Sequence, residues 1–375
     1  MRLEQQQALP VNHGFPVNIQ LRIQADSRGY IAYVQPNWGT WYRIRVGLTH
    51  NDVEELNTEL QSTLEEASSA FDSEAIEEED RKEALNVLAR KGNFAFKHIF
   101  AEGTPRDTIS KALSSGGTIQ IAAEEFILPW ELLYNGALGN ELDGNQFWGM
   151  QHVISRAIIQ DARPADFVSP QIQCSCPHVG LISCGELRHV QQEEVPLLQQ
   201  LEVEKKILLT RLRALDPESF DQELTAFDQF LRQEFQITHL ACHAIQKKPL
   251  TQSYLVVEQE FPISIQDFIA HDFWTTHNPV VILNACRTGT MNPLYTSNWA
   301  SLLWSRGARG VLATEFRVPD WFAAAFIQVF YEHFLASETI GASLMATRRH
   351  FWETQGNPLG LTYALYSSPM IQIIK

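Results

Sequence analysis

The stretches HLACHAIQKK (239–248) and VVILNACRTGT (280–290) decide the fold that this sequence predicts. Each begins as a run of mainly apolar residues without the polar alternation of a half-exposed strand, which is typical of strands buried on both faces of a parallel sheet. The first apolar run ends at His243 and the second at Cys286, and a polar segment follows each of them. Two strand ends therefore carry residue types that a buried core does not need.

The segments around these two stretches alternate between strand and helix patterns. Another apolar strand is expected in VGLISCG (179–185), and helical patterns cover 191–214 and 219–235. A further strand and two amphipathic helices are expected within 308–355. Alternation of this kind predicts an α/β fold with a mostly parallel sheet flanked by helices. Sites in such sheets lie at the carboxyl ends of the strands, where His243 stands.

The first half of the chain has a different pattern. Residues 1–50 read as strands with alternating side chains, and 51–101 read as helices. A segment rich in turn-forming residues, 161–178, separates them from the second half. We therefore expect a β-rich and helical N-terminal region over 1–165 and an α/β domain over 166–375. The N-terminal region is either a regulatory module or a degenerate copy of the second fold.

Composition limits the possible partners and compartments. Hydrophobic residues make up 45% of the 375 residues and the formal net charge is −15, which fits a globular protein and disfavours nucleic acid as the main partner. The N-terminus lacks the apolar core of a signal peptide, and the apolar runs are too short to span a bilayer. Five cysteines suit reduced thiols better than a disulfide framework. We expect a cytoplasmic protein with no membrane partner.

Several common site motifs do not occur. The sequence has no GxSxG, GxxxxGK[ST], GxGxxG or HExxH pattern, so serine-hydrolase chemistry and nucleotide binding have no support, and no cofactor is expected. Cys174, Cys176, His178 and Cys184 are close in sequence, but no further Cys or His pair completes a tetrahedral set. We interpret these four as ordinary core or loop residues and predict no metal site.

His243 and Cys286 together suggest a catalytic pair. Either residue alone would be interpreted as structural, because a buried cysteine packs as a small hydrophobe. A nucleophilic cysteine needs its thiolate, which an adjacent imidazole supplies by accepting the proton. Neighbouring parallel strands would bring these two strand ends within reach of each other.

These motifs, in this order, resemble the CHAT family of caspase-like peptidases, which is also related to separase. HLACHA and LNACRTG resemble the family's two strand ends. LPWELLY (128–134), GARGVLATEFRVPD (307–320) and the paired helices of 326–351 resemble its other landmarks. The resemblance covers roughly 125–370 and implies a caspase-like fold.

The resemblance also implies the roles of the pair. His243 would be the general base and Cys286 the nucleophile, with His239, inside the strand, as the other candidate base. The backbone N–H groups of Ala244 and Cys286 would form the oxyanion hole. The family usually has glycine where this chain has Ala244. If that position requires a positive φ, alanine costs about 1 kcal/mol there.

Three residues are candidates for binding substrate. Asp320 resembles the pocket acid of separase and would select a basic residue before the scissile bond, or it caps the helix that follows. Arg317 would instead bind an acidic side chain. Glu194, with Glu186 and Glu193, is a weaker pocket candidate, or the polar start of a helix.

The predicted function is that of a cysteine endopeptidase that cleaves a partner protein. By the same resemblance it would be a conditional protease of bacterial defence or cell death, switched on by a separate activating protein or ligand. The alternative is a catalytically silent CHAT-like module that binds other proteins.

Overall fold

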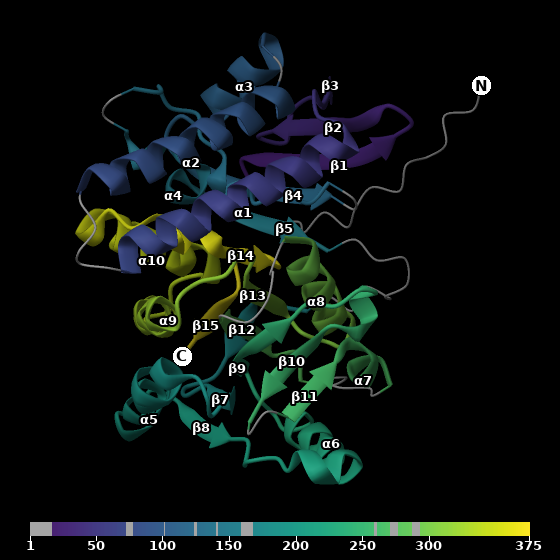
Figure 1. Cartoon of the computed structure of the whole chain (residues 1–375), viewed down its shortest axis with the longest axis vertical. Coiled ribbons are helices and arrows are strands. Elements are labelled where there is room, and N and C mark those ends of the chain that lie inside the picture. The colour runs from purple at the N-terminus through teal and green to yellow at the C-terminus, as the bar shows by residue number, and fades with distance from the viewer. Residues whose placement is uncertain are drawn as a thin grey trace.

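Figure 1 shows the computed structural model of the chain, in which two β-sheets meet edge to edge and helices cover their faces. Strands β1 to β5 lie in one half of the molecule, and β7 to β14 lie in the other. The structure describes residues 17–72, 78–100, 102–123, 126–139, 142–158, 168–258, 261–270, 277–286 and 293–375. Within these ranges, no helix has both the length and the apolar character that crossing a membrane requires.

The first sheet has five strands in the order β3-β2-β1-β4-β5. β1 pairs antiparallel with β2 and parallel with β4, and β4 pairs parallel with β5. β1 forms because its side chains alternate, so that Ile19, Leu21 and Ile23 face the core. The strands are β1 (Ile19–Asp26), β2 (Gly29–Pro36), β3 (Tyr42–Arg45), β4 (Gly117–Ala123) and β5 (His152–Ala157).

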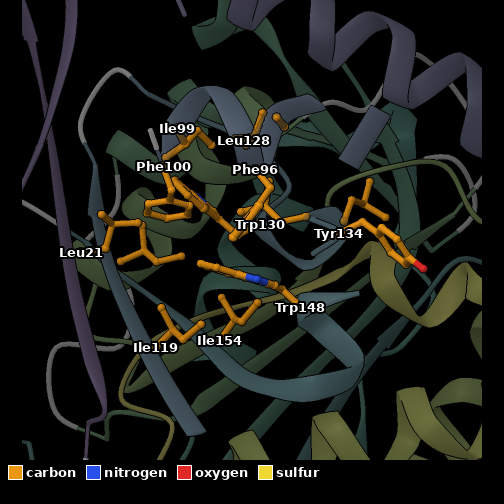
Figure 2. Close-up of a cluster of buried hydrophobic side chains, with 14 of the residues drawn as sticks. Leu21, Phe96, Ile99, Phe100, Ile119, Leu128, Trp130, Tyr134, Trp148 and Ile154 are labelled. Carbon is orange, nitrogen blue, oxygen red and sulfur yellow. The ribbon is translucent and has the colours of Figure 1, made fainter. Parts of the chain in front are cut away.

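Helices pack against this sheet through an aromatic core. Figure 2 shows Phe96 of the second helix and Phe100, directly after that helix, above Ile119 and Ile154 of the sheet, with Trp148 between the layers. The Phe100 and Trp148 rings stack with their centroids 5.4 Å apart. The elements of this layer are α1 (His50–Asp72), α2 (Glu78–Ile99), α3 (Thr104–Ala112), η1 (Trp130–Leu132), η2 (Gly144–Gln146) and α4 (Trp148–Gln151). The predicted β-rich and helical N-terminal region is thus confirmed.

The second sheet has eight strands and a parallel centre. β8, β7, β9, β12 and β13 run parallel, and antiparallel β10, β11 and β14 extend the two sides. The strands are β7 (His178–Ser183), β8 (Leu208–Arg211), β9 (Ile237–Ile245), β10 (Tyr254–Val257), β11 (Phe261–Ser264), β12 (Val280–Cys286), β13 (Gly310–Thr314) and β14 (Tyr363–Tyr366). A separate two-stranded sheet pairs β6 (Gln171–Gln173) with β15 (Gln372–Ile374).

Helices cover both faces of the second sheet, which explains the unbroken apolar strands. On β9, Ile237 and Ala241 pack on one face, whereas Leu240 and Cys242 pack on the other. The first face is covered by α5 (Val195–Val203), α9 (Asp320–Leu335) and α10 (Ile340–Gln355). The opposite face is covered by α6 (Phe220–Leu231), α7 (Ile265–Ala270) and α8 (Pro293–Ser305). The predicted α/β architecture is confirmed.

A buried cluster of charges joins the two sheets where β5 lies beside β14. The Arg156 guanidinium donates to both oxygens of Glu131, at 2.8 and 2.7 Å, and to Glu315 at 2.8 Å. Arg348 donates to Glu131 at 3.1 Å, and Tyr366 donates to Glu315 at 2.6 Å. Two cations therefore balance two carboxylates out of contact with water. The predicted boundary between 165 and 166 lies outside the described residues and stays a prediction.

Candidate active site

The backbone brings the two predicted catalytic residues into register. β9 and β12 are adjacent and parallel, and His243 pairs with Cys286, the last residue of β12. Residues in register on neighbouring strands lie about 5 Å apart. Both positions are at the carboxyl edge of the sheet, as the strand patterns predicted. The segment 287–292, which follows Cys286, lies outside the described residues.

Ala244 occupies the position where the family usually has glycine. It lies inside β9, paired with Leu255 of β10, and its side chain is buried in the apolar cluster beneath α6, α7 and α8. It is not among the residues with positive φ. The backbone is therefore extended at this position, and the penalty that a positive φ would impose on alanine does not arise.

Below this register pair, the same face of the sheet carries a fully buried polar group. His239 Nε2 lies 2.5 Å from an oxygen of Glu194, and Asn284 Nδ2 donates to both oxygens of Glu194 at 3.0 and 3.2 Å. His239 belongs to β9 and Asn284 to β12, so one carboxylate bonds two neighbouring strands. Glu194 itself ends a π-helical turn, η3 (Val190–Glu194), that leads into α5.

Two tyrosines complete this buried group. The Tyr331 hydroxyl of α9 lies 3.1 Å from His239 Nδ1, and the Tyr363 hydroxyl of β14 donates to Asn284 Oδ1 at 2.8 Å. Burial, and then the charge of Glu194, raises the pKa of Tyr331 well above its ordinary value. Its phenol therefore stays protonated and can donate to His239.

Glu194 corrects one prediction. It was expected either to line a substrate pocket or to form the polar start of a helix. It has no exposed surface, its carboxylate bonds His239 and Asn284, and it directly precedes α5. The other two glutamates named with it are exposed at the surface: Glu186 follows β7, and Glu193 bonds His189 at 2.7 Å. The sequence pattern predicts a polar helix start here, but it does not show that Glu194 is buried against the sheet.

Asp320 and Arg317 lie beyond the end of β13. Asp320 is the first residue of α9 and is largely buried, and Pro319 occupies the cap position, without a side-chain cap bond. A carboxylate in the first turn is favoured by the helix dipole. Arg317 is exposed between buried Phe316 and Val318. The substrate roles expected for Asp320 and Arg317 stay predictions.

The strand end beside β9 carries polar residues that the sequence did not reveal. Ser183, at the end of β7, donates to Glu258 at 3.0 Å and accepts from Arg211 at 3.0 Å. Burial raises the pKa of Glu258. Glu258 directly follows β10, which pairs with β9 through His243 and Val256. These groups border the predicted catalytic edge, and only their position after apolar strands could have drawn attention to them.

The remaining cysteines differ in environment from a reactive thiol. Burial raises the pKa of Cys184 and of Cys174, and raises that of Cys242 further. Cys176 contacts the Lys205 carbonyl, 3.7 Å away. His178, which was weighed with these cysteines as a metal ligand, bonds Thr210 at 2.8 Å. Among the described residues, no group of three or more His, Cys, Asp and Glu side chains has a metal-binding arrangement.

A pocket lies between the two halves of the molecule. A cavity of about 170 Å³ opens between the ends of β4 and β5 and the side of α8. Phe126 and Trp130 are among its lining residues, and Arg156 and Tyr366 border it. This volume is below the roughly 300 Å³ at which small-molecule pockets usually begin.

Comparison with known proteins assigns the fold and the family. The family model described as the CHAT domain matches residues 121–370. A chain of the Saccharomyces cerevisiae separase–securin complex matches with 12% identity and a TM-score of 0.53, over 96% of this chain and 30% of that one. The Drosophila initiator caspase Dronc matches more weakly, with 9% identity and a TM-score of 0.31, over 54% of this chain and 81% of Dronc.

The search of curated proteins found no match. This chain spans less than a third of the separase–securin chain, so that similarity concerns the fold alone. The likeness nevertheless extends over nearly all of the present chain, including the first sheet. The match of the family model to most of the second half and the end of the first confirms the resemblance drawn from the sequence motifs, and the chain belongs to the CHAT-domain family.

Proposed function

We propose that this chain is a cysteine endopeptidase that uses His243 and Cys286 as a catalytic dyad. The observation that carries the proposal is the register of these two residues at the carboxyl edge of adjacent parallel strands. The environment of the other thiols supports it, because buried cysteines with raised pKa values are poor nucleophiles.

The proposed reaction needs no cofactor. His243 takes the proton from the Cys286 thiol, and the thiolate attacks the scissile carbonyl carbon. The resulting oxyanion accepts hydrogen bonds from the N–H groups of Cys286 and Ala244, and the imidazolium gives its proton to the leaving amine. Water, deprotonated by His243, then hydrolyses the thioester and restores the free thiol.

The substrate is proposed to be a partner protein, and two residues make opposite predictions about its cleavage site. Asp320 would favour a basic residue before the scissile bond, and Arg317 an acidic one. The net charge of −15 supports a protein rather than a nucleic acid as partner.

Activity is proposed to be conditional, as in the bacterial defence or cell-death role that the family resemblance implies. The activator would be a separate protein or a ligand.

The test is to incubate the protein with candidate partner proteins and a proteome-derived peptide library, and to map the new N-termini. We expect cleavage by the wild type, and none by Cys286→Ala or His243→Ala. Cys176→Ala, which removes a partly exposed thiol away from the β12 end, is the matched control and should cleave normally.

The residue before each cut then separates the specificity proposals. Cuts after Arg or Lys support Asp320, cuts after Asp or Glu support Arg317, and cuts after apolar residues refute both. If wild type and Cys286→Ala produce the same N-termini in the presence of every partner, the peptidase proposal fails, and the chain acts as a protein-binding module.

A further inference from the structure

The buried polar group beneath the strand ends is unusual for a core. Its five members, named the platform here, are Glu194, His239, Asn284, Tyr331 and Tyr363. They come from five different elements, and all five are fully buried. Burying a carboxylate is costly, no Arg or Lys is among these five residues, and apolar side chains would fill the same space at lower cost. A purely structural role does not explain why the sheet is built around it.

The hydrogen bonds of the platform form one consistent chain. Tyr363 donates to Asn284 Oδ1, and the Asn284 amide then donates to Glu194. On the other side Tyr331 can donate to His239 Nδ1, which leaves His239 Nε2–H to donate to Glu194. Every donor points towards the single carboxylate or towards a group that bonds it. Glu194 thus lies at the centre of a hydrogen-bond network whose members are held in place by the fold.

The platform lies on the two strands that end at the proposed dyad. Asn284 is two residues before Cys286 on β12, and His239 is four residues before His243 on β9. Asn284 and His239 face the same side of the sheet, because both bond Glu194. Two residues along a strand span about 6.6 Å, so Asn284 is next in line below Cys286.

We propose that Glu194 is a positioning residue for catalysis. By bonding His239 and Asn284 together, it fixes the end of β9 against the end of β12 and so sets the separation of His243 and Cys286. Tyr331 and Tyr363 fix the two partners of Glu194 in turn. The inference rests on the proposed function and deepens it, since it assigns the geometry of the dyad to a group that touches neither substrate nor the reacting atoms.

The decisive variants are Tyr363→Phe and Tyr366→Phe. Both tyrosines lie on β14, both are buried, and each phenol donates to a buried acceptor, Asn284 for Tyr363 and Glu315 for Tyr366. Tyr363→Phe keeps the stacking of the ring on Phe326, whose centroid is 3.7 Å away. The two variants therefore remove comparable bonds, one inside the platform and one outside it.

We expect Tyr363→Phe to lower kcat at least fivefold with KM within twofold of the wild type, and Tyr366→Phe to leave kcat within twofold. Glu194→Gln, which keeps the shape but replaces an acceptor by a donor, should lower kcat at least tenfold. Thermal unfolding of each variant separates loss of positioning from loss of folded protein. Equal losses of kcat in the two tyrosine variants would overturn the proposal and leave the platform a structural feature.

A second measurement does not depend on peptide turnover. The rate at which iodoacetamide alkylates Cys286, followed by peptide mass spectrometry across pH, reports how well His243 assists the thiol. We expect Tyr363→Phe to slow alkylation near neutral pH severalfold, and Tyr366→Phe to leave it unchanged. If the wild type cleaves no substrate and its Cys286 is alkylated no faster than a free thiol, the proposed function fails. If the wild type does both and Tyr363→Phe behaves the same, only the positioning role fails.

Discussion

Two polar clusters among the described residues hold buried carboxyl groups, and they differ in the partners that these groups have. At the junction of the sheets, Glu131 and Glu315 are balanced by Arg156 and Arg348. In the platform, Glu194 bonds the His239 ring and the Asn284 amide, and no Arg or Lys is among the members. The junction cluster draws its members from both halves of the chain, whereas the platform belongs to the second half alone. The difference fits a junction cluster that holds the two halves together and a platform that positions the proposed dyad.

Removing one cation from the junction should have the largest effect on stability. Arg156→Ala leaves Glu131 and Glu315 buried with only Arg348 nearby, and we expect the free energy of unfolding to fall by about 3–5 kcal/mol. Urea denaturation measures this loss. Arg45→Ala, which breaks the exposed ion pair with Asp26, is the control and should cause a much smaller loss. Equal losses would mean that burial does not distinguish the junction cluster.

The junction cluster should also make stability depend on pH. Burial raises the pKa of Glu315 to about 7, from an ordinary value of 4.5. Below about pH 4.5 the carboxyl is protonated in both the folded and unfolded states and contributes nothing. As the pH rises towards 7, the unfolded state ionises first, so the free energy of unfolding falls, by roughly 3 kcal/mol in total.

Glu315→Gln isolates this effect. In the wild type the Tyr366 hydroxyl donates to Glu315. The amide of the variant cannot ionise, but its oxygen can accept the same hydrogen bond. Urea denaturation at pH 5, 6, 7 and 8 should show that the difference in unfolding free energy between variant and wild type grows up to about pH 7 and is then constant. A difference that does not change with pH would show that Glu315 is ionised throughout.

The sequence predicted the strands that carry the dyad but not the groups beneath them. His243 and Cys286 were identifiable because each ends an apolar run, and the register of parallel strands then follows from the fold. Asn284 also carried a signal, as a polar residue inside an apolar strand. Its partner Glu194 comes from a helix start about ninety residues earlier, and only the packing of α5 against the sheet makes them neighbours.

Local patterns also misplaced individual side chains. Glu194 looks like its neighbour Glu193 in the sequence, yet one is fully buried and the other is exposed. A π-helical turn ends at Glu194, and its wider spacing is not visible in the hydrophobic pattern. At Ala244, a penalty was expected only if φ were positive, and β10 continues the sheet past that point and keeps the backbone extended. Tertiary pairing decided both positions.

The smallest predicted effect tests whether the two clusters are independent. Tyr363 contacts both, because its hydroxyl donates to Asn284 while its carbonyl accepts from Arg348 at 2.5 Å. Tyr363→Phe and Tyr366→Phe should each lower the free energy of unfolding by about 1–3 kcal/mol, since each leaves a buried acceptor without its donor. Neither substitution alters the carbonyl that links the clusters, so the loss of unfolding free energy in the double variant should equal the sum of the two single losses within about 0.5 kcal/mol.

A larger coupling energy in urea denaturation would show that the hydroxyl of Tyr363 couples one cluster to the other. The junction and the platform would then act as a single unit, through which the N-terminal half could reach the ends of β9 and β12.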